Sequence, residues 1–287
     1  MKTIHSDKLK LIISMTVFGT IGIVRKYIPY PSSVIALVRG FVGMACLAII
    51  FIFTRKNTPK ELVKKNLPIL AISGALIGSN WICLFEAYQY TTVSVATMCY
   101  YMAPVFVILA SPIIFHEKLI LKKGLCAFAA LFGMVLVSGV LNSDSFNIKG
   151  ILFGLAAAIM YATIIILNKF ITGLSANDRT MFQLGFAAIS LLPYVLLTED
   201  ITTLDTSISV IVLLAIAGIV HTGLAYAMYF GSINKLPAQT VALFSYIDPI
   251  VAVILSFTIL KENLSILSII GIVIVIGAMI ISDIGEQ

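Results

Sequence analysis

Four ionisable side chains stand inside long apolar runs of the sequence, where a charge is costly. They are Arg39, Glu86, His221 and Asp248. An ionised residue at the centre of a membrane helix costs roughly 2.5–3.5 kcal/mol on insertion scales, so such residues usually face a cavity or one another. Because histidine titrates near neutral pH, we interpret His221 and Asp248 as a proton-coupling pair. The alternative is a purely structural hydrogen bond.

Glu86 is the residue that we expect to meet a positively charged ligand. Aromatic residues surround it, and aromatic faces attract ammonium groups by roughly 0.5–2 kcal/mol through cation–π interactions. The alternative is an ion pair with Arg39 that holds two helices together, and both could hold in different states of the protein. The predicted substrate-binding residues are Arg39, Asn80, Trp81, Glu86, Tyr100, Tyr101, Tyr161 and Tyr246.

Some of these residues also have a structural interpretation. Asn80 could hydrogen-bond a ligand or hold two helices together. Tyr161 and Tyr246 rank above Tyr226 and Tyr229, because tyrosines near helix ends usually form interfacial belts.

Two prolines, Pro104 and Pro249, fall in the middle of predicted helices. A proline there removes a backbone hydrogen bond and permits a bend. Both residues are therefore candidate hinges, with static kinks as the alternative.

The sequence lacks the patterns of an enzyme or a metal site. His116-Glu117 lacks the second histidine of a zinc protease motif, and Ser73-Gly74 lacks the preceding glycine of a serine hydrolase elbow. No histidine or carboxylate cluster has metal-ligand spacing, and no phosphate-binding glycine loop occurs. We expect no enzyme activity, no cofactor and no bound metal.

The elements that position these residues are predicted to be membrane helices. Of 287 residues, 60% are hydrophobic and 11% are charged, whereas a soluble domain carries about 25% charged residues. A spanning helix needs about 20 mostly apolar residues. Cutting at charges, prolines and polar clusters predicts an all-α membrane protein with ten transmembrane helices, at 9–27, 32–53, 68–89, 93–115, 121–140, 149–170, 179–197, 208–230, 236–260 and 265–283.

The basic residues set the predicted orientation. With both termini in the cytoplasm, fourteen lysines and arginines fall on the cytoplasmic side and four on the opposite side, as the positive-inside rule requires. Basic residues in short segments between apolar runs also argue against nucleic-acid binding.

The two halves of the chain resemble each other. Residues 101–105 read Tyr-Met-Ala-Pro-Val and residues 246–250 read Tyr-Ile-Asp-Pro-Ile, an offset of 145. Five helices per half is an odd number, so the second repeat (142–287) should enter the membrane with the opposite orientation to the first (1–141). Inverted repeats are typical of secondary transporters, whose sites lie between the repeats.

These segments resemble the EamA family of the drug/metabolite transporter superfamily. The most telling are the paired proline-to-glutamate stretches, Pro104 to Glu117 and Pro249 to Glu262. The resemblance implies a ten-helix fold whose central cavity is lined mainly by the first, third, fourth, sixth, eighth and ninth helices. The fifth and tenth helices would form an outer scaffold.

The resemblance also implies a function. We expect a plasma-membrane (bacterial inner-membrane) carrier for the efflux of amino acids or related metabolites by alternating access. The main alternative is an uptake carrier for amines or quaternary ammonium compounds, ahead of a channel or an intramembrane enzyme. The expected partners are a small-molecule substrate and the lipid bilayer, with a homodimer left open.

Overall fold

The computed structural model describes residues 2–54, 59–117, 120–138, 147–259, 261 and 265–284, and these contain helices and no strand. The predicted repeat boundary at 141 and 142, and Glu262, lie outside the described residues. The helices are α1 (Lys2–Lys26), α2 (Ser32–Thr54), α3 (Lys60–Tyr90), α4 (Val93–Tyr100), α5 (Ala103–Phe115), α6 (Leu121–Ser138), α7 (Ile148–Phe170), α8 (Ala176–Thr198), η2 (Ile201–Thr203), α9 (Ile208–Ile216), η3 (Ala217–Leu224), α10 (Ala225–Ile233), α11 (Ala238–Phe244), α12 (Ile247–Thr258) and α13 (Ile266–Asp283).

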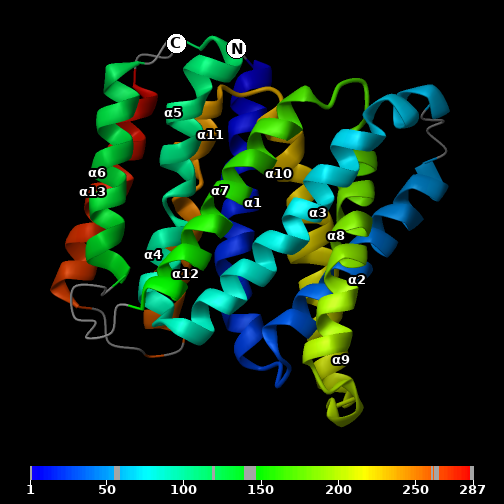
Figure 1. The fold of residues 1–287 in the computed structure, drawn as a ribbon. Coiled ribbons are helices and arrows are strands. Elements are labelled where there is room, and N and C mark those ends of the chain that lie inside the picture. Colours follow the sequence, from blue (N-terminus) through cyan, green and yellow to red (C-terminus); the bar gives the residue numbers. More distant parts are fainter. Residues whose placement is uncertain are drawn as a thin grey trace.

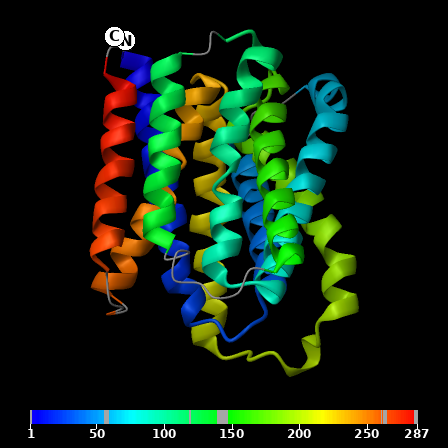
Figure 2. The same ribbon diagram turned by 60° about the vertical axis from the view of Figure 1, so that its left-hand side comes forward.

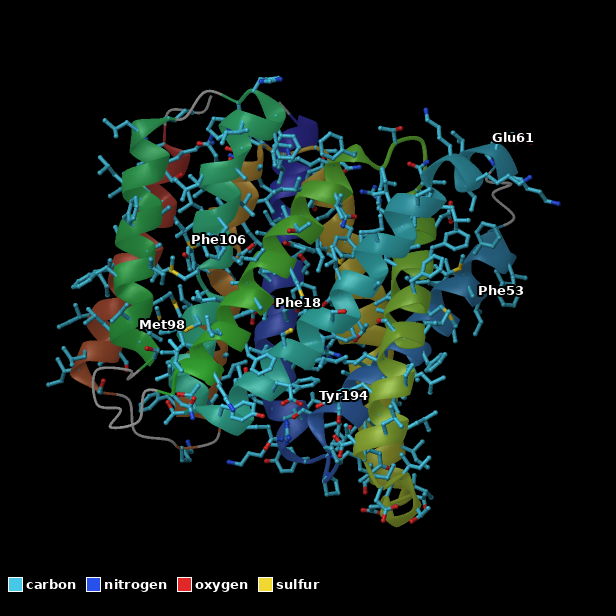
Figure 3. All side chains as sticks on the ribbon, in the orientation of Figure 1. Phe18, Phe53, Glu61, Met98, Phe106 and Tyr194 are labelled. Carbon is cyan, nitrogen blue, oxygen red and sulfur yellow. The ribbon has the colours of Figure 1, made fainter. Side chains whose placement is uncertain are left out.

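Eight segments in the described residues are long and apolar enough to cross a membrane, and Ile266–Ser282 forms a further, shorter apolar helix. The eight are Ser32–Phe53, Lys60–Tyr90, Val95–Phe115, Leu121–Ser138, Ile148–Phe170, Ala176–Thr198, Ile208–Ile233 and Ala238–Leu255. Large apolar side chains cover the outside of the bundle, such as Phe53, which is 82% exposed and lies at the edge of the molecule (Figure 3). Such a surface suits lipid rather than water. The chain is a multi-pass membrane protein.

Two predicted helix starts were too late. The helix predicted from residue 9 begins at Lys2, and the one predicted from residue 68 begins at Lys60 and contains Pro68. Lysine and glutamate are good helix formers, so a charged segment next to a membrane helix extends it rather than ends it.

Three predicted helices are internally interrupted. The predicted helix 93–115 divides into α4 and α5 at Tyr101–Met102, and the predicted helix 236–260 divides into α11 and α12 at Ser245–Tyr246. The predicted helix 208–230 contains the π-helical segment η3 between α9 and α10. π-helical turns are rare and often mark functional sites.

The helices form a bundle in which both chain ends lie at the same end of the molecule (Figures 1 and 2). We call this the terminal end. In Figure 1, α6 and α13 lie together at one edge and α2, α8 and α9 at the other. Between them, α3 packs against α7 and α8, and α1 packs against α10 and α12.

Glycines allow the closest helix contacts. A Cβ atom on Gly74 or Gly78 would lie 2.6 or 2.8 Å from a backbone oxygen of α8, and one on Gly150 or Gly154 would lie 3.1 Å from backbone atoms at or near α4. The two glycines of each pair are four residues apart, a small-xxx-small spacing that permits such close approach of helices.

Candidate functional site

A cavity of about 330 Å³ lies in the middle of the bundle. It extends from Tyr161 and Tyr229 to Arg25 and Ser32, at the end of the molecule opposite the terminal end. Small-molecule sites commonly have about this size. The cavity is lined by Phe18, Ile21, Gly22, Arg25, Ser32, Ile35, Ala36, Arg39, Trp81, Leu84, Phe85, Tyr88, Thr97, Tyr100, Tyr101, Tyr161, His221, Tyr226, Tyr229 and Asp248.

The lining comes from more elements than the family resemblance implies. The expected contributions come from α1, α3, α4, α7, η3, α10 and α12, but α2 also contributes Ile35, Ala36 and Arg39. The described residues of α6 and α13 contribute none, which agrees with their expected scaffold position. The close packing of α2 on η3 accounts for its contribution, since a Cβ atom on Gly43 would lie 3.0 Å from backbone atoms of Gly218 and Gly223.

Aromatic rings make up much of the wall. The ring of Tyr100 stacks on that of Tyr161, with centroids 5.5 Å apart and planes 14° apart. The hydroxyl oxygens of Tyr161 and Tyr229 lie 2.8 Å apart, within hydrogen-bonding distance. Phe18, which Figure 3 places in the middle of the molecule, packs edge to face on Tyr226 and Tyr229. We call Tyr100, Tyr161 and Tyr229 the tyrosine floor of the cavity.

Two opposite charges face this aromatic space. The guanidinium carbon of Arg39 lies 4.3 Å from the centroid of the Trp81 ring, a cation–π contact. The buried Nε of Arg39 meets no hydrogen-bond acceptor. Within the described residues, the carboxylate of Asp248 accepts no hydrogen bond and forms no ion pair. Both groups therefore retain hydrogen-bonding capacity for a ligand.

His221 lies on the same cavity wall, in η3. Its Nε2 is 2.8 Å from Oγ1 of Thr20 on α1, and its Nδ1 is 3.4 Å from the carbonyl oxygen of Ile216. No hydrogen bond joins His221 to Asp248 in the described part of the chain. The predicted proton-coupling pair thus shares one cavity, and the imidazole is oriented by Thr20.

Three predicted binding residues lie outside the cavity lining. The hydroxyl of Tyr194 donates to Oε1 of Glu86 at 2.5 Å, and no Arg39–Glu86 ion pair occurs in the described structure. The amide of Asn80 donates to the carbonyl oxygen of Ala157 at 2.6 Å and so joins α3 to α7. The hydroxyl of Tyr246 donates to the carbonyl oxygen of Tyr101 at 3.1 Å.

Tyr226 and Tyr229 line the cavity, although their positions suggested an interfacial belt. That interpretation was wrong because η3 continues directly into α10, which makes one long helix whose depth the sequence boundaries underestimated. The available signal was their spacing of three residues, which puts both rings on one helix face.

The prediction that the two prolines lie in the middle of continuous helices was wrong. Pro104 is in the first turn of α5, and Pro249 is the third residue of α12. A proline is tolerated in a first turn because its missing N–H would have no partner there. Each proline thus lies just after a break between two helices. The role of the two prolines as hinges stays a prediction.

A second set of contacts lies at the terminal end of the bundle. Nζ of Lys169 lies 3.5 Å from Oε1 of Glu117 and donates to the carbonyl oxygen of Leu236 at 2.8 Å. The same Glu117 oxygen accepts the backbone N–H of Ala238, at the start of α11, at 3.2 Å. The Glu117 carboxylate therefore caps the start of α11. We call these four residues the Lys169–Glu117 latch.

The chain is similar to known proteins in both sequence and fold. A profile of the EamA-like transporter family matches residues 8–139 and 148–282. The chain is 27% identical over 282 residues to the uncharacterized transporter YxxF of Bacillus subtilis (strain 168), covering 97% of this chain and 90% of that one. It is 29% identical over 233 residues to protein PecM of Dickeya dadantii (strain 3937), covering 77% of each. A chain of known crystal structure shares the fold, with a TM-score of 0.84, 97% coverage of both chains and 16% identity.

Proposed function

Because the chain belongs to the EamA-like transporter family of the drug/metabolite transporter superfamily, we propose that it is a secondary carrier built from two inverted five-helix repeats. The proposed ten spans are the eight long apolar segments together with α1 and α13. The helix bounds support the repeat: α2 begins at Ser32 and α8 at Ala176, 144 residues later, while α6 and α13 begin 145 residues apart. The position of both termini at one end supports an even number of crossings (Figures 1 and 2).

The proposed substrate is a zwitterion, an amino acid or a related metabolite. The single observation that carries this proposal is the presence of Arg39 and Asp248 in one aromatic cavity, neither in an ion pair within the described residues. Arg39 would bind the carboxylate of the substrate through its planar set of donors. Asp248 would bind the ammonium group, assisted by cation–π attraction to the surrounding rings. Each charge of the substrate then compensates a charge that is costly in the membrane.

Alternating access is the proposed mechanism. The cavity reaches the end opposite the termini, and the proposed closure of the terminal end is made by the Lys169–Glu117 latch. Inverted repeats can exchange conformations, which opens one end as the other closes. The breaks that precede Pro104 and Pro249 are the proposed hinges, because a helix interrupted there can change direction without losing further backbone hydrogen bonds.

Efflux coupled to proton entry is the proposed direction. A proton and an ammonium group would compete for the Asp248 carboxylate, so each crossing of the cavity would carry one or the other. His221, held by Thr20, would supply a second protonatable group beside it. The excess of basic residues at the terminal end supports cytoplasmic termini, and the proposed location is the bacterial plasma membrane.

The test is a substrate panel with the purified protein in proteoliposomes. Each amino acid is compared with its amine, which lacks the carboxylate, and with its acid, which lacks the ammonium group. The parent protein should prefer the zwitterion. Asp248→Asn should lose the advantage of the zwitterion over the acid, and Arg39→Gln the advantage over the amine. The matched control is Glu86→Gln, which changes a carboxylate outside the cavity lining.

An amine carrier is the second candidate, because Asp248 stands among aromatic rings as a cation site would require. Arg39 in the same cavity disfavours a ligand that carries only positive charge. If the parent protein moves the amine faster than the zwitterion, or if Asp248→Asn transports all three compounds as before, the zwitterion proposal is wrong.

A further inference from the structure

A second cavity, of about 620 Å³, lies at the terminal end of the molecule. It is bounded by α1, by the N-terminal turn of α8 and by α10, and it shares no lining residue with the central cavity. None of the transport steps proposed above uses it. We call it the terminal cavity.

The terminal cavity has an excess of positive charge. Lys10, Arg179 and Lys235 line it together with one carboxylate, Asp7. The Asp7 carboxylate lies 3.4 Å from Nζ of both lysines, whose side chains are 47% and 61% exposed. One carboxylate cannot neutralise three cations, so the cavity favours an anion.

Arg179 supplies donors that the protein does not use. The residue is only 3% exposed, and its Nη1 donates to the carbonyl oxygen of Asn168 at 3.2 Å. Its Nε is buried and meets no acceptor. A guanidinium carries five donors, and the hydrogen bonds among the described residues use only Nη1 of Arg179. Because Arg179 lines the cavity, its remaining terminal donors suit a ligand with acceptor oxygens.

The N-terminus of α8 lies beside these side chains. Ser175, Ala176 and Asn177 line the cavity, and Ser175 caps the helix by accepting the N–H of Asp178. First-turn N–H groups of a helix have no partner within the helix, and the helix dipole favours an anion there. The Asp178 carboxyl is not part of the cavity lining.

The remaining wall is apolar and follows one face of a helix. Leu224, Ala227, Met228 and Gly231 line the cavity at spacings of three and four residues, below the polar Asn234. From Asn234 to Leu224 the helix descends about 15 Å into the membrane. Leu224 is 41% exposed on the lipid-facing surface. The cavity thus joins a basic pocket at the membrane surface to an apolar wall that descends into the bilayer.

From this combination we propose that the terminal cavity binds an anionic phospholipid. The phosphate of the headgroup is held by Arg179, the two lysines and the start of α8, and an acyl chain lies along the apolar face of α10. Such a lipid would bridge α1, α8 and α10, which come from both halves of the chain. A free anion would satisfy the basic pocket but leave the apolar wall uncovered.

The test is lipid binding to the delipidated, full-length protein in detergent, followed by native mass spectrometry and thermal unfolding. The probes are phosphatidylglycerol, phosphatidylcholine with the same acyl chains, and inorganic phosphate alone. A basic residue near an anionic membrane surface is worth about fivefold in binding. Phosphatidylglycerol should therefore bind about fivefold more weakly to Arg179→Gln and about 25-fold more weakly to the Lys10→Gln, Lys235→Gln double variant.

The matched control is the Lys64→Gln, Lys65→Gln double variant, which removes two exposed lysines from the start of α3. It should bind phosphatidylglycerol as the parent does. Equal binding of the two lipids, or an equal loss in the control, would overturn the proposal. Stabilisation by inorganic phosphate alone to the extent given by phosphatidylglycerol would assign the pocket to a soluble anion instead. If Arg179→Gln does not fold, the exposed lysines still decide the outcome.

Discussion

The Lys169–Glu117 latch offers the sharpest perturbation of the proposed alternating access. It joins the ends of α5 and α7 to the start of α11, and these elements belong to different halves of the chain. If the terminal end opens during transport, the latch exists only in the state described above. Removing it must then shift the balance between the two states, because a contact made in one state alone sets their relative free energy.

The size of the shift follows from the geometry of the latch. The two side chains are 14% and 23% exposed, with nitrogen and oxygen 3.5 Å apart, so solvent screens them less than a surface pair. A hydrogen bond to a charged group is worth about 1.5–3 kcal/mol. Taking about 2 kcal/mol, Glu117→Gln should raise the population open at the terminal end about 30-fold relative to the closed state.

Cysteine accessibility in nanodiscs measures this shift. The background is a variant without the four native cysteines, Cys46, Cys83, Cys99 and Cys126. A reporter cysteine replaces Ser245, which is 7% exposed and does not line the central cavity. Its rate of modification by a maleimide should rise up to about 30-fold with Glu117→Gln. A second reporter at Gly22, where a side chain has open space within the cavity, should react more slowly.

Glu61→Gln is the matched control, because it removes an exposed glutamate at the start of α3, away from the latch. Neither reporter should respond to it. The reasoning fails if Glu117→Gln leaves the Ser245 reporter within twofold of the parent. It also fails if both reporters become faster together, since that result indicates general loosening rather than exchange between two states.

Three further predictions concern packing and coupling. Gly43→Leu should destabilise the protein by about 1–3 kcal/mol, because its Cβ would lie 3.0 Å from backbone atoms of η3, and thermal unfolding should show no such loss for Gly22→Ala. Asn80→Leu should lower the free energy of unfolding by about 1 kcal/mol, because it removes the hydrogen bond to Ala157, but it should leave the KM for substrate unchanged. A raised KM would show that Asn80 takes part in substrate binding. His221→Gln should make flux insensitive to an imposed pH gradient while substrate exchange continues, and a retained pH response would remove His221 from the coupling mechanism.

The helical architecture could be read from the sequence because apolar length is a direct consequence of bilayer thickness. The interruptions could not. Tyr101–Met102 and Ser245–Tyr246 are not marked as helix ends by composition, and η3 differs from its neighbours only in its hydrogen-bond register. These features depend on packing between helices, such as the close contact of Gly43 with Gly218 and Gly223.

The candidate site was only partly predictable, because the sequence does not state which way each helix faces. On α3, Trp81, Leu84, Phe85 and Tyr88 share one face and line the cavity. Glu86 lies five residues after Trp81, about 140° around the helix, and its carboxylate meets Tyr194 instead. The spacing of the aromatic residues indicates which face of α3 lines the cavity, whereas Glu86 was chosen for its charge and lies on another face.

The sequence marks Asp248 and Arg39 as costly charges in apolar runs, but it does not give their partners. A buried arginine can be paired with a carboxylate or stacked on an aromatic ring, and the choice depends on the relative rotation of α2 and α3. The structure places the guanidinium over Trp81. That arrangement leaves its donors available, which is the basis for proposing a ligand with two charges.

Exchange of substrate across proteoliposomes tests the carrier assignment most directly. Vesicles are loaded with an unlabelled amino acid and placed in a low concentration of the same labelled compound, with no pH gradient. An alternating-access carrier should accumulate label transiently and saturably, and Asp248→Asn should lower this accumulation to that of the matching acid. Label that only equilibrates, at a rate proportional to its concentration and independent of the internal amino acid, would contradict a carrier.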